Sequence, residues 1–374
     1  MKILIASTSQ FGYLIDYYRY YGYLKNKGHD VKYISWDYGK EKVENNNPDI
    51  IYVSRSGSKP ARLYRFIKAI IDYEKKMKFD RIMVSCFKLV PSLLLSIPNK
   101  KMYLDIRQVA VNDEKYKRTF YDGMMRFAAK RFKNTSIITD LAAQHIGITR
   151  YNLLPLGGAY FPKSSPDDSS LDQYREIFKN DDFIFLYVGT LHKRRMVETA
   201  IGFHEFLKKH PGAKAKYLIV GDGYGEDLNN LRKYINDNNL GQYIYSIGYV
   251  VQQKLPIFFE NADCGVTYFP LTPFNDVQPS TKTYEYLING IPVIATSTKD
   301  NVKLLTQPGP PCGVVIKDTA EDFERSIGEI LANRNIYDKA AIAEKFSEYE
   351  WDRLFVRYLD DVLDLPKQKQ AQAI

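Results

Sequence analysis

The residues best suited to chemistry lie in one stretch of the C-terminal half, residues 278–295. Its pattern predicts a loop, a short helix that starts just after Ser280, a stop at Gly290 and then a buried strand. Ser280 is placed to cap this helix, and the exposed amides of the first turn would attract a phosphate. Lys282 lies in that turn and Glu285 one turn later on nearly the same face, so that a cation could meet phosphate while a carboxylate accepts hydrogen bonds from ribose hydroxyls. An ordinary capped helix with an internal ion pair explains the pattern equally well.

A second candidate is a run of cations that follows the apolar segment 183–188. The segment reads as a strand, and Gly189 and Thr190 come directly after it. Three consecutive cations then precede the next helical pattern: Lys193, Arg194 and Arg195. A basic cluster just past the carboxyl end of a strand could neutralise a leaving diphosphate, because that charge grows as the glycosidic bond breaks. A solvated charge run is the commoner explanation of such a triplet, although its strand-end position favours a function.

Three weaker candidates also lie at the ends of expected strands. Gly221 and Asp222 belong to a glycine-rich turn after an apolar run, and Gly12 follows the first strand. Glycines at such places allow a ligand to approach but also serve any tight turn. Asp105 and Arg107 lie on one side of another strand, where a structural ion pair and a role in binding an acceptor are equally compatible with the pattern.

The elements that must position these residues are strands alternating with helices. Strands are expected at 2–6, 31–35, 50–53, 81–85, 102–106 and 136–139, and again at 183–188, 217–220, 243–247, 265–268, 292–295 and 313–316. Helical periodicity lies between them, for example at 14–27, 61–78 and 120–132. This alternation indicates parallel sheets. The expected fold class is therefore α/β, with two Rossmann-like doubly wound domains that face each other across a cleft.

A cluster of turn and breaker residues divides the chain. We expect an N-terminal domain at 1–160, a linker at 161–178 and a C-terminal domain at 179–345. Residues 346–374 are expected to form a C-terminal helix, able to pack back on the N-terminal domain, and a polar tail. In that helix Leu354, Tyr358 and Val362 share one apolar stripe.

Length and charge support two domains with different partners. A chain of 374 residues exceeds the size at which one core usually stops growing. Residues 1–165 contain 29 lysines and arginines against 14 aspartates and glutamates, whereas residues 166–374 contain 24 against 30. Such an asymmetry points to an anionic partner for the first half, with nucleic acid, anionic lipid and a phosphorylated acceptor all open at this point.

The remaining composition indicates a cytoplasmic protein. The three cysteines, Cys86, Cys264 and Cys312, fit no disulfide or zinc spacing. The most apolar stretch, 89–97, is interrupted by Pro91 and is far shorter than the roughly 20 residues of a spanning helix. We therefore expect no membrane span, and a site at the inner face of the cell membrane is the second possibility for its location.

Taken in order, several segments resemble the C-terminal domain of family 4 (group 1) glycosyltransferases of the GT-B fold, of the type that builds bacterial surface polysaccharides. They are 187–191, 220–223, 247–250, 261–266 and 282–293. The resemblance covers about 183–345; the first half is similar more loosely, through 27–31 and 105–107. It implies transfer with retention of the anomeric configuration, no metal and no cofactor, with the nucleotide sugar as a substrate. It also implies that the domain at 179–345 binds the nucleotide sugar and that the domain at 1–160 binds the acceptor.

The resemblance also implies roles for individual residues. Lys193 or Arg194 would hold the diphosphate, Glu285 would bind ribose, and Tyr249 with Val250 would flank the base. The contacts to phosphate would come from the start of the helix, at Pro279, Ser280, Thr281 and Lys282. The rest of the donor-binding set consists of Gly12, Gly189, Thr190, Gly221 and Asp222. The catalytic candidates are Arg194, Lys193, Arg107 and Asp105. Two departures stand out. Val277 takes the place of a glutamate that the family often has, and the histidine that many members carry near the position of Arg107 is missing.

The favoured hypothesis is a retaining, metal-independent hexosyltransferase that takes its sugar from a nucleotide sugar, with UDP preferred. Its acceptor would be a glycan or a polyprenyl-diphosphate-linked sugar, with peripheral contact between the basic first half and an anionic membrane. The segment 116–133, with Phe120, Met124, Phe127 and Phe132 among cations, could lie on that surface unless its apolar positions are core. A nucleotide-sugar epimerase, a sugar-phosphate synthase and a non-catalytic binding subunit are the alternatives. A nucleic-acid binder is disfavoured, because no RNA-binding or helix-turn-helix signature is visible.

Overall fold

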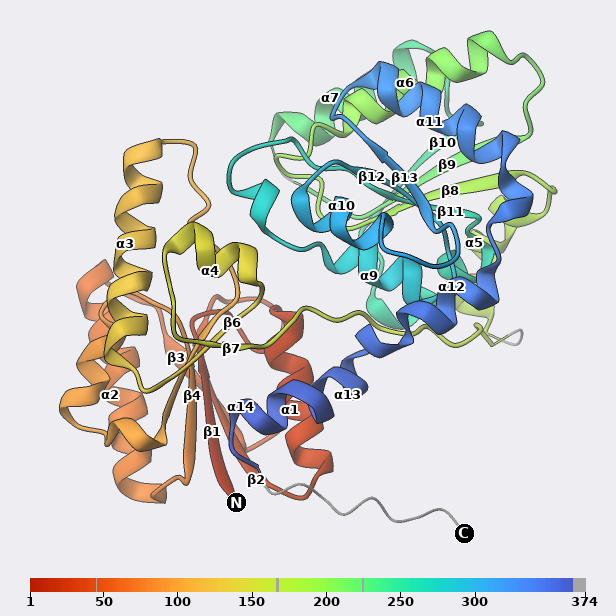
Figure 1. Ribbon diagram of the computed structural model, residues 1–374. Helices are drawn as coiled ribbons and strands as arrows, with labels where there is room; N and C mark the ends of the chain where they lie inside the picture. The colour runs from red at the N-terminus through yellow and green to blue at the C-terminus, as the bar shows by residue number, and fades with distance from the viewer. Residues whose placement is uncertain (45, 166–167, 224, 366–374) are drawn as a thin grey trace. The chain divides into compact units, whose positions relative to one another are not determined.

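The computed structural model describes residues 1–44, 46–165, 168–223 and 225–365 (Figure 1). The chain divides into two compact units. The first unit consists of Met1–Leu156 together with the segment that begins at Trp351, and the second unit is Gly157–Glu350. The first unit is thus built from both ends of the chain, and the second is continuous.

The first unit contains a parallel sheet in the order β3-β2-β1-β4-β5-β6-β7. The strands are β1 (Lys2–Ser7), β2 (Asp30–Asp37), β3 (Ile50–Ser54), β4 (Arg81–Ser85), β5 (Met102–Ile106), β6 (Asn134–Ile137) and β7 (Asn152–Leu153). The helices are α1 (Ile15–Asn26), α2 (Lys59–Met77), α3 (Lys115–Arg131) and α4 (Asp140–Ile146), with short 3-10 helices η1 (Val90–Leu95) and η2 (Asn99–Lys101). The central strands are buried on both faces, as expected for continuous apolar runs.

The second unit repeats this architecture with a parallel sheet in the order β10-β9-β8-β11-β12-β13. Its strands are β8 (Phe183–Val188), β9 (Ala215–Val220), β10 (Ile244–Gly248), β11 (Cys264–Thr267), β12 (Val293–Thr296) and β13 (Gly313–Ile316). Its helices are α5 (Asp172–Arg175), α6 (Met196–Lys209), α7 (Glu226–Asp237), α8 (Pro256–Asn261), α9 (Thr281–Ile288), α10 (Lys299–Leu305), α11 (Ala320–Ala332) and α12 (Lys339–Phe346). Short 3-10 helices are η3 (Ser169–Leu171), η4 (Glu176–Phe178), η5 (Gln252–Lys254), η6 (Asn275–Val277), η7 (Arg334–Ile336) and η8 (Ser347–Tyr349).

Helices cover both faces of this second sheet. Figure 1 shows α6, α7 and α11 over one face, while α9 and α12 pack together over the other. Phe203 and Phe323 from α6 and α11 lie fully buried against Phe185 and Tyr217 of the sheet. In each sheet the chain reverses its direction of winding beside the first strand, between β1 and β4 and between β8 and β11. Ligands of doubly wound folds bind at the carboxyl ends of strands near such a point. The predicted fold class of two parallel α/β domains is confirmed.

Residues 161–178, expected as a linker, are placed within the second unit. Phe161 stacks on Phe259 of α8 with 4.3 Å between ring centroids, and Tyr174 packs against Phe258 at 5.0 Å. The Ser164 hydroxyl donates a hydrogen bond of 2.7 Å to Glu260. The described part of this segment therefore packs on α8.

The segment from Trp351 packs against α1 of the first unit. Phe355 contacts Tyr20 with 5.3 Å between ring centroids, and Asp360 forms an ion pair of 2.6 Å with Lys27. The Tyr103 hydroxyl of β5 donates a hydrogen bond of 2.7 Å to Asp364. The polar tail predicted after Pro366 lies outside the described residues.

That segment is not the single regular helix that the apolar stripe predicted. It consists of α13 (Trp351–Leu354), a π-helical turn η9 (Phe355–Leu359) and α14 (Asp360–Val362). Leu354 and Val362 are buried, but Leu359 takes the buried place expected for Tyr358, which is half-exposed. A π turn inserts one residue and so shifts the stripe. Within the described ranges, no helix combines the length and the hydropathy that crossing a bilayer requires.

Candidate functional site

The site in the second unit begins where three neighbouring strands end in glycine. Gly189, Gly221 and Gly248 follow or close β8, β9 and β10, which are adjacent in the sheet. The Gly189 amide donates to the carbonyl of Val220, and the Gly221 amide donates to that of Gly248, each at 2.8 Å. A Cβ atom on Gly221 would lie 1.9 Å from the Gly189 carbonyl oxygen. Only glycine allows this backbone contact. The strand ends at Gly189, Gly221 and Gly248 therefore form a surface without side chains, here called the glycine ledge.

Two cations converge beside this ledge on the ring of Phe269. The Arg194 guanidinium lies 4.3 Å from the ring centroid, and Lys282 Nζ lies 5.5 Å from the same centroid and 5.3 Å from that of Tyr187. A Cβ atom on Gly189 would be 2.1 Å from Lys282 Cε, so the lysine stem runs directly over the end of β8. The predicted residues Gly189, Arg194 and Lys282 are thus brought together.

The electrostatics of this pair favour an anion. Burial and, to a smaller extent, the nearby charge of Arg194 lower the pKa of Lys282 to about 7, while the charge of Glu285 opposes the shift. Burial also lowers the pKa of Arg194. Arg194 Nε is buried and has no hydrogen-bond partner among the described residues. Two like charges in a partly dehydrated place would be stabilised by a bound anion.

The loop after β8 separates Arg194 from its two basic neighbours. Lys193 and Arg195 have positive φ angles of 56° and 54°, and the Arg194 amide donates to the Leu191 carbonyl at 3.2 Å. Lys193 is exposed. Arg195 forms ion pairs of 3.2 Å with Glu198 and Asp318. Of the three predicted cations, Arg194 is therefore the one that meets Lys282.

The short helix α9, which carries Lys282, is hydrogen-bonded to the end of β8. In α9 the hydroxyl of Tyr286 accepts a hydrogen bond of 2.9 Å from the Val188 amide. Thr283 Oγ1 donates to Asn301 at 2.9 Å. After the helix, Gly290 has φ 75° and the amide of Ile291 donates back to the Tyr286 carbonyl, which confirms the predicted stop.

The prediction that Ser280 caps this helix is wrong. Its side chain makes no capping hydrogen bond, and its Oγ atom is buried with no partner in the described residues. The hydroxyl therefore adds an unused hydrogen-bonding group to a helix start whose first amides have no intrahelical acceptor. Pro279 and Thr281 beside it are half-buried, and Glu285 is half-buried one turn later.

The remaining predicted donor-binding residues surround the ledge. Tyr249, directly after Gly248, is 74% exposed, whereas Val250 is buried. Asp222 is exposed, and its carboxylate accepts a hydrogen bond of 2.8 Å from the Gly223 amide. Thr190 is exposed, and its carbonyl accepts a 2.6 Å hydrogen bond from the Tyr187 hydroxyl. An exposed aromatic ring beside the glycine ledge suits stacking with a planar base.

The predicted residues of the first unit form a separate cluster. Arg107 pairs with Asp16 of α1 at 2.6 Å and lies 3.9 Å from Asp105. Asp105 is buried, which raises its pKa, and accepts a 2.7 Å hydrogen bond from Ser136. Arg107 Nη2 and Asp105 Oδ2 have no hydrogen-bond partner among the described residues. Gly12 lies in the loop before α1, where a Cβ atom would be 2.5 Å from Val43.

Two residues of these clusters were not anticipated. Phe269 comes two residues after the end of β11, so its position near a strand end was a usable signal, whereas its contact with two cations had no signal in the sequence. Asp16 lies far from Arg107 in sequence, and only the packing of α1 beside β5 brings the two together.

Known proteins resemble both the sequence and the fold. The family described as Glycosyl transferases group 1 matches residues 171–349. The alpha-monoglucosyldiacylglycerol synthase of Acholeplasma laidlawii is 23% identical over 271 residues, which are 64% of this chain and 66% of that protein, slightly less than two thirds of its length.

Solved structures extend the similarity to nearly the whole chain. Sucrose-phosphate synthase from Thermosynechococcus elongatus has a TM-score of 0.73 at 16% identity and covers 96% of this chain and 97% of that one. Anabaena Alr3699/HepE in complex with UDP-glucose has a TM-score of 0.69 at 14% identity, with coverage of 98% and 100%. The fold is that of the GT-B class. The match to the group 1 glycosyl transferases covers residues 171–349, which are almost all of the second unit.

Proposed function

We propose that this protein is a retaining glycosyltransferase that moves a sugar from a nucleoside-diphosphate sugar, with UDP favoured, to a glycan or lipid-linked acceptor in polysaccharide biosynthesis. One observation carries the proposal. Arg194 and Lys282 meet over Phe269 at the glycine-ended strands, with one buried guanidinium nitrogen unpaired among the described residues. The diphosphate of a nucleotide sugar has the charge and size to occupy that place.

The chemistry follows from where charge develops. As the bond between the anomeric carbon and the diphosphate breaks, negative charge grows on the departing oxygen beside Arg194 and Lys282. Ser280 Oγ and the first amides of α9 would donate to the same phosphate. The acceptor hydroxyl would attack from the face that the diphosphate leaves, give its proton to the departing oxygen, and so retain the configuration. Charge stabilisation by side chains and amides leaves the reaction without need of a metal ion.

Base and acceptor are proposed from chemistry and from relatives. Tyr249 offers its exposed ring to a base, and Glu285 offers a carboxylate to ribose hydroxyls. UDP is supported by the UDP-glucose in the Anabaena complex, and a lipid-linked acceptor by the glucosyl lipid in the name of the Acholeplasma protein. The protein would then act in the cytoplasm, at the inner face of the cell membrane.

Two neighbouring arginines provide the test. Arg194→Ala should lower the affinity for UDP and UDP-sugars by about 10- to 100-fold, because it removes a charge-assisted contact to the diphosphate. Arg195→Ala removes the same charge from the adjacent position, where the side chain is already paired with Glu198 and Asp318, and should change the affinity by less than about threefold. Calorimetric titration of both variants decides the matter. Equal effects of the two substitutions would contradict the proposed site.

A further inference from the structure

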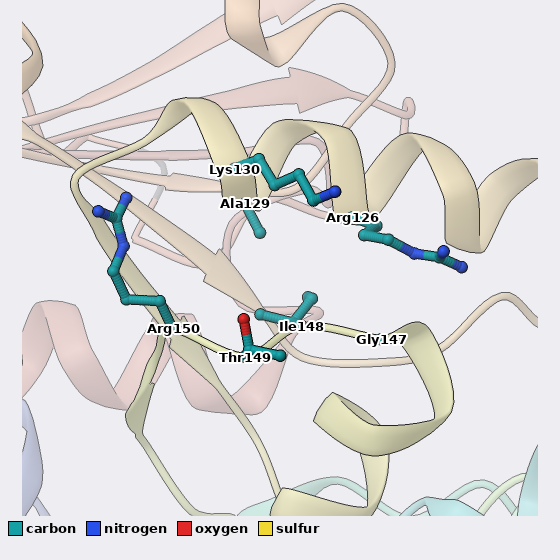
Figure 2. Close-up of a pocket in the computed structure, with 7 residues that line it drawn as sticks. All are labelled: Arg126, Ala129, Lys130, Gly147, Ile148, Thr149 and Arg150. Atoms are coloured by element: carbon teal, nitrogen blue, oxygen red, sulfur yellow. The ribbon is translucent and has the colours of Figure 1, made fainter.

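A pocket in the first unit, remote in sequence from every predicted site residue, lies between α3 and the loop that follows α4 (Figure 2). Arg126 and Lys130 approach it from the helix, and Thr149 and Arg150 from the loop. Figure 2 shows the Thr149 hydroxyl directed toward the helix across the pocket. Three cations and one hydroxyl around a small hollow make a site suited to a phosphate group.

Two of the three cations of this pocket are held in place by carbonyl oxygens. Arg126 Nε donates to the Ile146 carbonyl and Arg150 Nη2 to the Phe132 carbonyl, each at 2.7 Å. Neither bond neutralises a charge, and both leave other guanidinium N–H groups for a ligand. Lys130 forms no ion pair or hydrogen bond with any residue that the structure describes. The lining contains no acidic side chain.

The surface beside the pocket is apolar, aromatic and exposed. On α3, Phe120 is 63% and Phe127 50% exposed. Leu95 is 87% exposed at the end of η1, which packs against α3. Helix geometry places Arg126 and Lys130 about 60–100° around the axis from Phe127, so the pocket borders this surface. The alternative that the apolar positions of this segment belong to the core is therefore wrong for Phe120 and Phe127 and correct for Phe132, which is fully buried; Met124 is half-buried.

The positive charge of α3 is complementary to an anionic surface. α3 has six lysines and arginines and one aspartate. That aspartate, Asp122, faces inward, where it accepts a 3.0 Å hydrogen bond from the Ala110 amide and lies 3.3 Å from His145. Arg131 extends over the Phe127 ring at 4.5 Å, an arrangement that keeps the cation at the level of the aromatic face. Exposed aromatic and leucine side chains amid cations are typical of segments that lie in the interface of a bilayer.

We propose that this pocket binds the phosphate of an anionic membrane lipid while Phe120, Phe127 and Leu95 enter the bilayer interface. A polynucleotide would use the cations but would leave Leu95 exposed to water, so the apolar residues favour lipid. The inference rests on the proposed action at a membrane face, and it names the part of the chain that reaches the lipid. It does not depend on which sugar is transferred.

The test measures co-sedimentation of the full-length protein with vesicles of phosphatidylglycerol and phosphatidylcholine, and with vesicles of phosphatidylcholine alone. We expect binding to the first kind only. The double variant Arg126→Gln/Lys130→Gln should bind at least about tenfold more weakly. Phe120→Ser/Phe127→Ser should lose the binding that persists at high salt, because only the apolar part of the interaction resists screening. UDP binding, measured on each variant, should be unchanged, which separates failure here from failure of the donor site.

A charge-matched control is available in the second unit. Lys208 and Lys233 are exposed and paired with Glu205 and Asp237, so Lys208→Gln/Lys233→Gln removes the same charge from elsewhere. An equal loss in this control would overturn the proposal, as would absence of binding to the anionic vesicles. Inorganic phosphate that binds the pocket while vesicles do not would identify a soluble phosphate ligand instead. Retention of single-stranded RNA with a steep salt dependence, lost in the pocket variant, would identify a nucleic-acid site and also overturn it.

Discussion

Arg194 and Lys282 occupy a place that costs the free protein stability. Two cations lie against one ring, partly withdrawn from water, and their mutual repulsion opposes the charged state. Proteins retain such groups where function requires them, and substitution then often stabilises the fold. The pair is therefore a place where stability and ligand binding should respond in opposite directions.

Lys282→Met tests this opposition directly. Because the charged lysine is disfavoured in the folded state, removing it should raise the free energy of unfolding by roughly 1–2 kcal/mol at neutral pH. The gain should be greatest below pH 7, where the folded lysine must carry its charge, and should fade as the pH rises toward the unfolded pKa. Urea unfolding measures the stability, and titration with a nucleotide sugar should show binding largely lost. A destabilised variant that still binds would argue for a structural lysine.

The low pKa of Lys282 also predicts how donor binding depends on pH. The diphosphate needs the protonated amine, so above pH 7 the free protein must take up a proton in order to bind. Affinity for a nucleotide sugar should therefore fall by up to about tenfold per pH unit between pH 7 and 9. Lys282→Arg, which stays charged, should bind with little pH dependence over the same range. Calorimetry in buffers of different ionisation enthalpy detects the proton that is taken up on binding. If the affinity of the wild type did not change with pH, binding would not be coupled to protonation of Lys282.

The identity of these residues was accessible from the sequence, but their environment was not. Strand-end position singled out Arg194, and helix spacing singled out Lys282. Nothing local to either residue indicates that both converge on Phe269, because that ring comes from a third segment, the loop after β11. Similarly, Ser280 looks like a cap by its place before the helix, whereas its rotamer in the folded chain leaves the hydroxyl unused.

Two hydroxyls at helix starts in the second unit allow the role of α9 to be separated from ordinary capping. Thr319 accepts a 3.2 Å hydrogen bond from the Asp322 amide and caps α11, whereas Ser280 caps nothing. Thr319→Ala should lower the free energy of unfolding by about 1 kcal/mol without changing nucleotide affinity. Ser280→Ala should leave stability within about 0.5 kcal/mol of the wild type and weaken nucleotide binding several-fold. Thermal unfolding with and without UDP reports both quantities, and the reverse pattern would contradict the assignment.

The bounds of strands and helices were predicted correctly where the apolar pattern was strong. They were predicted wrongly where an adjoining element changed them or where no apolar pattern was present. The strands at 81–85, 102–106, 183–188 and 313–316 have the predicted bounds, because each is a short apolar run between breakers. The strand predicted at 136–139 begins and ends two residues earlier, because Thr139 leaves the sheet to cap α4. β7 has two residues and no periodicity to detect. The helix α3 begins at Lys115, five residues before the predicted start, with polar residues that no apolar pattern marks.

The division of the chain predicts that the second unit can exist alone. Residues 157–350 are continuous and have their own core around Phe203 and Phe323. The isolated fragment should fold, unfold cooperatively, and gain stability from UDP as the full chain does. A fragment of residues 1–156 should be much less stable, since it lacks the partners that Asp360 and Asp364 provide for Lys27 and Tyr103. Circular dichroism and differential scanning calorimetry of the two fragments measure this; a stable 1–156 fragment would contradict it.

The return of the chain to its first unit has a consequence for biosynthesis. When the ribosome has made residues 1–156, the partners of Tyr20, Lys27 and Tyr103 have not yet been synthesised, because they lie about 200 residues further along the chain. At roughly 5–20 residues per second that delay lasts some 10–40 seconds, during which the later unit emerges and can fold by itself. The order of maturation is then opposite to the order of translation. Nascent chains halted before Trp351 should consequently carry a nucleotide-binding half that is already native and a leading half that proteases still cut.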